Sequence, residues 1–254
     1  MRFTIWRENV EYIHCVVRDS LTKAPSVLGH LRSLIEAARS NEFHQVDVFT
    51  INHDTLIEQE LQAHKVDYSD GFDQTTETCD YWTAESFGCA RNRVRLAKLH
   101  GSVDWYTYRP DPHHPMRQMT GRPKIREVQD LSGKPQRPLN DESVMLIGSF
   151  NKILDYTGSI FSDLFCSFRA SLWSTRRLIV GGYGFRDKGV NQAIVEWLRG
   201  SRDRKLIIVH RDYKKYEHNG RKAIGDLFST NGLQIAGTGT WFQETSLANL
   251  QSRF

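Results

Sequence analysis

The sequence contains no long apolar run. No stretch approaches the ~18 consecutive apolar residues that a membrane-spanning helix needs. The opening residues, Met-Arg-Phe-Thr-Ile-Trp-Arg-Glu, introduce charge where a signal peptide would have its apolar core. Internal repeats and low-complexity tracts are also missing. We therefore expect a protein of the cytoplasm that has no membrane segment.

Cysteine is scarce, and its spacing does not suggest a metal site. The four cysteines are scattered along the chain at Cys15, Cys79, Cys89 and Cys166. None of them forms a pair with the short spacing of a zinc knuckle, and His113-His114 has no cysteine near it in sequence. We therefore expect no structural zinc and, in a reducing cytoplasm, free thiols.

The chain also lacks a strong excess of one charge. It has 34 basic and 30 acidic residues and a net charge of +4, a balance that does not by itself indicate nucleic-acid binding. Positive charge is concentrated in two stretches, Arg109–Arg137 and Arg199–Lys222. Two interpretations remain open for them: solvated loops and helix ends, or a surface that meets a polyanion or a partner protein.

What is present is a recurring pattern of a short β-branched strand, a polar or glycine-rich tip, and a helix. The predicted strands are Val46–Ile51, Val94–Leu99, Leu178–Val180 and Leu206–Val209. The predicted helical segments are 8–40 (divided at Pro25), 55–63, 161–173 and 190–198. This alternation predicts an α/β fold with a Rossmann-like parallel sheet and flanking helices.

Residues 107–142 break the pattern. They hold six of the seven prolines, many charges and almost no periodic apolar residues. The six are Pro110, Pro112, Pro115, Pro123, Pro135 and Pro138. Because proline interrupts helices and central strands, we expect an irregular insert or flap here with little regular structure.

Polar residues and glycines follow the predicted strands at their carboxyl ends. These ends carry Asn52, His100, Gly182 and His210, and ligands of open parallel sheets bind at that edge. Each residue taken alone has an ordinary explanation. An Asn-rich tip caps a helix, a histidine can end a strand, and glycine serves any turn with positive φ.

Their combination and order resemble the sirtuin-like, NAD-cleaving family, in the form found in bacterial antiphage-defence proteins. Thr50–Asp54 matches that family's Thr-x-Asn-x-Asp strand tip, and Leu99–Ser102 matches its Leu-His-Gly-Ser segment. Leu178–Asp187 with Asn191 resembles a later strand end of the form Gly-Tyr-x-Phe-x-Asp followed by Asn. Ile208–Asp212 stands where the family has Ile-Asn-x-Glu.

This resemblance covers about residues 44–215 and implies a site. NAD is the implied substrate, and no metal is implied. His100 is the implied base, Asn52 would hold ribose hydroxyls or orient a water, and Asp54 would brace the site. The implied cofactor-binding residues are Thr50, Gly101, Ser102, Gly181, Gly182, Tyr183, Asp187, Asn191, His210 and Asp212.

The residue types suit cleavage of the nicotinamide–ribose bond. Nicotinamide leaves a cationic pyridinium as a neutral amide, so no general acid is needed, and the sugar becomes oxocarbenium-like, as in glycoside hydrolysis. A histidine, with its ordinary pKa near ~6.5, can take a proton from a ribose hydroxyl or the incoming water. A neutral asparagine both donates and accepts hydrogen bonds.

The sequence departs from the family pattern in three places. No Gly-Ala-Gly-type loop that would cradle the pyrophosphate precedes residue 44. The four-cysteine zinc module of deacetylase sirtuins does not follow Ser102, which favours NAD hydrolysis over deacetylation. His210-Arg211-Asp212 replaces Asn-x-Glu, although His210 and Asp212 can still hydrogen-bond ribose hydroxyls.

The first departure leads to an expected single sirtuin-like domain over 1–254 that is incomplete at its amino end. Three explanations stay open: a truncated product, a loop supplied by another chain, or weak or absent NAD binding. A missing first strand would leave a sheet edge unpaired, which promotes association. We therefore expect a homo-oligomer or a complex with a partner such as an ATPase or nuclease. Any contact with nucleic acid is expected to come through that partner.

Two functions follow from the resemblance. The first is an NAD hydrolase that acts as an antiphage effector by depleting NAD. The alternative is a catalytically silent, nucleotide-sensing or scaffolding subunit of a larger defence complex. Under the first, Asn52 and His100 are expected to face each other across one pocket at the carboxyl edge of the sheet.

Overall fold

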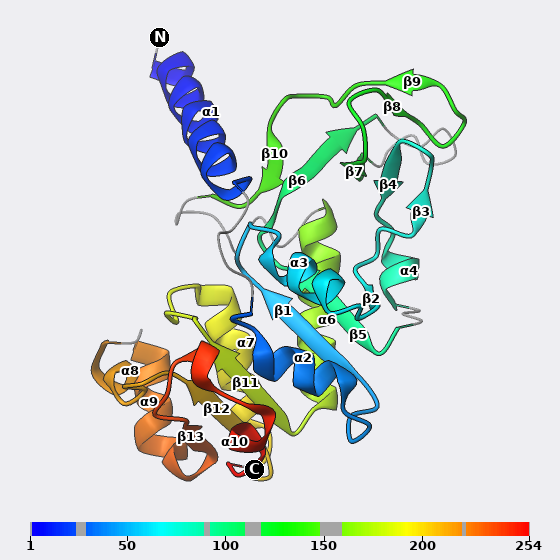
Figure 1. Cartoon of the computed structure of the whole chain (residues 1–254). Helices are drawn as coiled ribbons and strands as arrows, with labels where there is room; N and C mark the ends of the chain where they lie inside the picture. The colour runs from blue at the N-terminus through cyan, green and yellow to red at the C-terminus, as the bar shows by residue number, and fades with distance from the viewer. Residues whose placement is uncertain are drawn as a thin grey trace. The chain divides into compact units, whose positions relative to one another are not determined.

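The structure is a computed structural model, and its chain forms two compact units (Figure 1). The described residues are 2–23, 29–88, 92–109, 118–147, 159–219 and 222–253. The first unit comprises Met1–Val27, Gln45–Gly148 and Asp155–Phe165, and the second comprises Leu28–His44, Ser149–Leu154 and Cys166–Phe254. Each unit is described by itself below.

The first unit contains a parallel sheet of the strands β1 (Val46–Thr50), β5 (Val94–Lys98) and β2 (Tyr68–Ser69), in the order β1-β5-β2. Helices α3 (Leu56–Ala63) and α4 (Ala84–Gly88) lie between these strands in the chain. β5 is the central strand and its apolar side chains are buried, as expected for a strand covered on both faces. The predicted strands at 46–51 and 94–99 and the helix at 55–63 are confirmed.

A second, antiparallel sheet in the same unit has the order β10-β6-β7-β4-β3. Its strands are β3 (Gln74–Thr75), β4 (Cys79–Tyr81), β6 (Gly101–Tyr108), β7 (Met119–Pro123) and β10 (Ser143–Met145). A small hairpin joins β8 (Val128–Gln129) to β9 (Pro135–Gln136). A core of Cys79, Tyr81, Tyr108 and Val128 supports these strands.

Residues 118–142 are thus more regular than their composition predicts. β7 is a sheet strand with neighbours on both sides, β6 and β4. Pro123 is the last residue of β7, and Pro135 is the first residue of the two-residue strand β9. Proline is tolerated at such positions because its missing N–H removes no hydrogen bond from the middle of a strand. The residues 110–117, which hold three of the prolines behind the prediction, lie outside the described residues.

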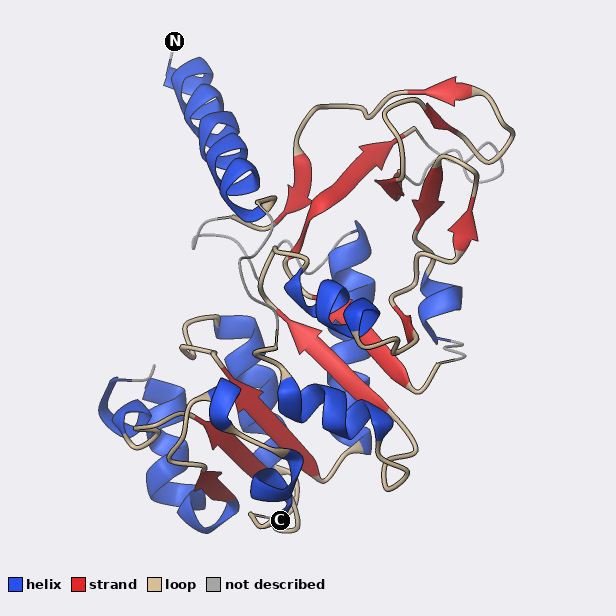
Figure 2. Cartoon of the chain, viewed as in Figure 1, coloured by secondary structure: helices blue, strands red, loops and turns tan. Residues whose placement is uncertain are grey.

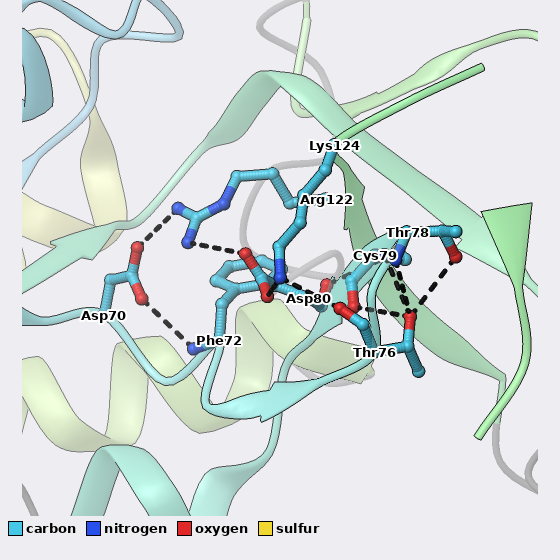
Figure 3. Close-up of polar contacts among 8 residues, drawn as sticks. All are labelled: Asp70, Phe72, Thr76, Thr78, Cys79, Asp80, Arg122 and Lys124. Atoms are coloured by element: carbon cyan, nitrogen blue, oxygen red, sulfur yellow. Dashed lines mark hydrogen bonds and ion pairs between the residues drawn. The ribbon is translucent and has the colours of Figure 1, made fainter. Parts of the chain in front are cut away.

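Ion pairs connect the end of β7 to Asp70, which follows β2, and to Asp80 on β4, as Figure 3 shows. Arg122 on β7 forms an ion pair with Asp70 at 2.6 Å, and its guanidinium lies 4.7 Å from the centre of the Phe72 ring. Lys124 pairs with Asp80 at 2.7 Å. Arg122 and Asp70 are both at least three-quarters buried, so these bonds are shielded from solvent more than surface pairs are.

The second unit has its own parallel sheet, in which β11 (Arg177–Gly181), β12 (Lys205–Val209) and β13 (Ile235–Gly237) lie in that order. Helix α7 (Lys188–Arg199) connects β11 to β12, which makes a βαβ unit. The core includes Trp197 on α7 and Ile207 on β12, both fully buried. The predicted strands and helix of this region are confirmed.

The remaining helices also match the periodicity of the sequence (Figure 2). The segment 8–40 forms α1 (Arg2–Leu21) and α2 (Arg32–Arg39), and 161–173 lies within α6 (Ser159–Ser174). The second unit adds α8 (Lys215–Asn219), α9 (Lys222–Asn231), α10 (Leu247–Gln251) and two 3₁₀ turns, Gly232–Gln234 and Phe242–Glu244. Within the described ranges, the helices are all too short or too polar to traverse a lipid bilayer.

Candidate functional site

The carboxyl ends of β1 and β5 are direct neighbours in the first unit. The two strands pair in parallel, with Thr50 opposite Lys98. The Leu99 N–H donates to the Thr50 carbonyl at 2.8 Å, and the Val103 N–H donates to the His53 carbonyl at 3.0 Å. The structure therefore brings the Thr-x-Asn-x-Asp tip and the Leu-His-Gly-Ser segment together through backbone bonds.

Asn52 and His100 differ in their exposure at this edge. Asn52 is exposed, and its N–H donates to the Thr50 hydroxyl at 3.0 Å. His100 is 2% exposed, and its ring lies 6.1 Å from the ring of His53. That Asn52 and His100 face each other across one pocket stays a prediction.

Asp54 lies two residues before α3, the helix that follows the strand tip. One oxygen of its carboxylate accepts the Leu56 N–H at 3.1 Å, at the start of α3. An acceptor at this place satisfies one of the unpaired N–H groups of a helix amino end. The bond holds the turn that follows Asn52, and the bracing role of Asp54 in a reaction stays a prediction.

A buried ion pair lies behind the two motif segments. Lys98, the last residue of β5, is 2% exposed, and its ammonium donates to a carboxylate oxygen of Glu58 on α3 at 2.9 Å. The same ammonium donates to the Asp54 main-chain carbonyl. Burial raises the pKa of Glu58, and Lys98 opposes that rise. Lys98 thus connects the end of β5, directly before His100, to the turn that contains Asp54.

Gly101 and Ser102 have packing roles in this structure. Gly101 has a φ of 78°, and a Cβ placed on it would lie 1.9 Å from the Val144 carbonyl oxygen beside β10. Ser102 is fully buried, and its hydroxyl bonds the Asp104 carboxylate. Close backbone approach and a left-handed conformation explain the glycine. The contacts of both residues with a cofactor stay predictions.

The glycine-rich turn after β11 lies in the second unit. A Cβ on Gly181 would lie 2.2 Å from the Phe242 ring, so this glycine makes room for an aromatic side chain of the same unit. Gly182 has a φ of 67° with open space where its Cβ would be. The first glycine is therefore explained by packing and the second by backbone conformation.

The other motif residues of this turn bond to one another. The Tyr183 hydroxyl lies 2.7 Å from the amide oxygen of Asn191, and the Asn191 amide donates to the Phe185 carbonyl at 2.8 Å. Asp187 caps α7 by accepting the Val190 N–H at 2.9 Å. The Asp187 carboxylate thus satisfies one of the N–H groups at this helix amino end and places a negative charge there.

Gly182→Ala should lower the free energy of unfolding by about 1–2 kcal/mol, because an L residue at positive φ is strained even where space is open. Gly184→Ala is the matched control. Gly184 has no positive φ and no close neighbour, so alanine there should be neutral or slightly stabilising. Urea denaturation of both variants measures the difference. Equal effects at the two positions would show that Gly182 does not need the left-handed conformation.

His210 and Asp212 follow β12 in the same unit. The Asp212 N–H donates to His210 Nδ1 at 2.9 Å. His210 Nε2 lies 2.8 Å from the ammonium nitrogen of Lys215. The ring makes edge contacts with Trp241 and Tyr216, at 4.9 Å and 5.5 Å between ring centres. The segment Ile208–Asp212, predicted to contact a ribose, thus contains a half-buried histidine that is in contact with two aromatic rings and a lysine.

The family model described as the SIR2-like domain matches residues 46–236, which is three quarters of the chain. The chain belongs to the SIR2-like domain family. Domains of this family are Rossmann-like and use NAD, so the predicted fold class and the resemblance to a sirtuin-like family are confirmed. The antiphage form and the missing amino-terminal loop stay predictions. No match to the chain was found among curated proteins.

Metal ligands do not gather in the part of this SIR2-like domain that the structure describes. No group of three or more His, Cys, Asp or Glu side chains there could hold a metal ion. The polar residues at the strand ends are instead used in hydrogen bonds and ion pairs.

Four residues near the SIR2-like motifs were missed by the sequence reasoning. They are His53, Glu58, Lys98 and Lys215. A lysine as the last residue of a buried strand, directly before Leu99-His100, was a readable signal, since such a cation needs a buried carboxylate. The partner Glu58 could not be found in this way, because α3 carries two buried glutamates, Glu58 and Glu60.

Proposed function

We propose that this SIR2-like domain hydrolyses the nicotinamide–ribose bond of NAD and acts in the cytoplasm as an antiphage effector that depletes NAD. The observation that carries the proposal is the direct pairing of β1 and β5, which sets the Asn52 tip beside the His100 segment. Side chains at adjacent parallel strand ends lie close enough to act on one ligand.

The chemistry requires few groups. The bond between the ribose C1′ and the pyridinium nitrogen breaks, and its electron pair makes nicotinamide neutral. A water oxygen bonds to C1′, and the proton it loses goes to His100, so the products are ADP-ribose, nicotinamide and a proton. Asn52 holds the ribose hydroxyls or orients the water. Asp54 braces the tip through its bond to the Leu56 N–H.

Purified full-length chain is expected to release nicotinamide and ADP-ribose from NAD in equal amounts. Bacteria that express the chain are expected to lose cellular NAD after phage infection, and cells that express a His100→Ala variant are expected to keep it. Chromatography of the reaction and of cell extracts measures both quantities. Nicotinamide release without NAD loss in infected cells would contradict the defence role and leave the hydrolase assignment standing.

A catalytically silent subunit that senses a nucleotide or serves as a scaffold is the second candidate, and two observations favour it. His100 is 2% exposed, and the carboxylate of Asp187 caps the amino end of α7, where a pyrophosphate would meet a like charge. A protein that binds NAD but releases no nicotinamide, alone or from infected cells, would be this silent subunit. The same assay therefore separates the two candidates.

We also propose that the protein works as a homo-oligomer or with a partner such as an ATPase or nuclease, which would bring any nucleic acid to it. Among the strands that the structure describes, β1 pairs with β5 alone and β11 pairs with β12 alone. Open strand edges offer backbone groups to another chain. This supports association.

A further inference from the structure

The end of β12 carries an unusual set of donors. β11, α7 and β12 form one βαβ unit, with a glycine-rich turn after the first strand and His210 directly after the second. In nucleotide-binding units of this form, the residues after the second strand meet the ribose next to the adenine. An acidic residue there selects ribose hydroxyls, and a cationic residue accommodates a phosphate on the 2′ oxygen. This chain has both kinds of residue after β12, Asp212 and Lys215, so the hydrogen bonds around them decide.

The hydrogen bonds of His210 fix which atoms it offers. Its Nδ1 accepts the Asp212 N–H, so the proton of the neutral ring is on Nε2. This Nε2 lies 2.8 Å from the Lys215 nitrogen, and a lysine ammonium has three donors and no acceptor. In this tautomer both nitrogens are donors, so they can share one acceptor but do not bond to each other. An acceptor-only group that bonds to both of them relieves the conflict, and a phosphate is such a group.

The surroundings of this pair suit an anion. Residues 210–217 contain three cationic side chains and two carboxylates, so their formal charge is positive before any proton is added to His210. Lys215 is only partly exposed, and its ammonium lies 5.1 Å from the centre of the Tyr216 ring. Partial burial strengthens the attraction between an ammonium and a phosphate relative to open water.

We propose that His210 and Lys215 bind a phosphate on the 2′ oxygen of an adenosine ribose. The ligands of the second unit then include 2′-phosphorylated adenine nucleotides as well as NAD. This inference rests on the proposed function for its catalytic meaning, but the phosphate contact itself can be measured without any reaction.

The test compares two ligands that differ by one phosphate, adenosine 2′,5′-bisphosphate and adenosine 5′-monophosphate, titrated calorimetrically into the full chain. The bisphosphate is expected to bind about tenfold more tightly, as two charge-assisted hydrogen bonds predict. The preference should shrink as salt is added, because the contact is only partly shielded from ions.

Three variants locate the contact. Lys215→Met keeps the aliphatic stem and His210→Asn restores an amide that can serve a hydroxyl, so each should reduce the preference to about twofold or less. Lys214→Met removes the same charge from an exposed neighbour and should keep most of the preference. Thermal unfolding of each variant shows that the fold is retained.

Equal affinity for the two ligands, no binding of either, or equal losses in Lys214→Met and Lys215→Met would each overturn the inference. The proposed function fails by a different measurement, the absence of nicotinamide release from NAD. A chain that cleaves NAD without preferring the bisphosphate retains the proposed function alone. A chain that prefers the bisphosphate but cleaves nothing retains the phosphate site alone.

Discussion

His100→Ala is expected to lower the rate of nicotinamide release from NAD by about 10²–10⁴, the usual effect of losing a general base. In the proposed mechanism the imidazole takes the proton of the attacking water, so its removal should slow that step. His64→Ala is the matched control, since His64 is a half-exposed histidine directly after α3 in the same unit and its ring bonds the Glu60 carbonyl. That variant should keep its activity.

Loss of activity has to be separated from loss of fold, because His100 is 2% exposed. Circular dichroism and urea denaturation of His100→Ala provide the comparison. Asn52→Ala gives a second route, since Asn52 is exposed and its removal should cost little stability while lowering the rate to a similar degree. Full activity in both variants would disprove the roles assigned to these residues.

The fold was predictable where periodicity and burial agree. The apolar residues of Val94–Leu99 predict a strand. In the structure these residues are buried, and β5 is the central strand of its sheet. The pairing of Thr50 with Lys98 then follows, because the carboxyl ends of neighbouring parallel strands lie at one edge. Local pattern and topology were thus enough to bring two distant motifs together.

Composition was a poorer guide between residues 118 and 142. Short strands there are stabilised by contacts distant in sequence, such as the Tyr81 hydroxyl bond to the Gln129 carbonyl at 2.7 Å. The Arg122–Asp70 ion pair is of the same kind. Such contacts produce no periodic pattern in the sequence. The prediction therefore rested on prolines and charged residues, some of which lie at strand ends and in ion pairs in the structure.

Motif matching located the turn after β11 but gave no reason for each of its residues. Tyr183, Asp187 and Asn191 bond within the turn or cap α7, and Gly181 makes room for Phe242. A motif can therefore record what a turn needs in order to fold as well as what a ligand needs. Only the side-chain contacts of the structure separate these two causes.

Lys98→Met is expected to lower the free energy of unfolding by about 3–5 kcal/mol near neutral pH, because it leaves the Glu58 carboxylate buried without its cation. Glu58 is 7% exposed and Lys98 is 2% exposed, so water cannot replace the lost partner. Lys134→Met, on an exposed turn, should change stability by no more than about 0.5 kcal/mol. Urea denaturation measures both.

The pH dependence of this loss has a definite sign. Burial already raises the pKa of Glu58 above its ordinary 4.5, and Lys98 opposes that rise. Without Lys98 the pKa should rise further, so the folded variant takes up a proton and loses stability as pH increases through the raised value. The difference between Lys98→Met and the parent should therefore be smaller at pH ~4, where Glu58 is largely protonated in both.

A second change should repair the first. In the Lys98→Met, Glu58→Leu double variant no buried charge remains unpaired, so most of the lost stability should return, as it does when buried ion pairs are replaced by apolar residues. Lys98 also donates to the Asp54 carbonyl, so this variant should regain stability without regaining full nicotinamide release. Recovery of both would show that Lys98 acts on stability alone. A single-variant loss below about 1 kcal/mol would show that the pair is solvated.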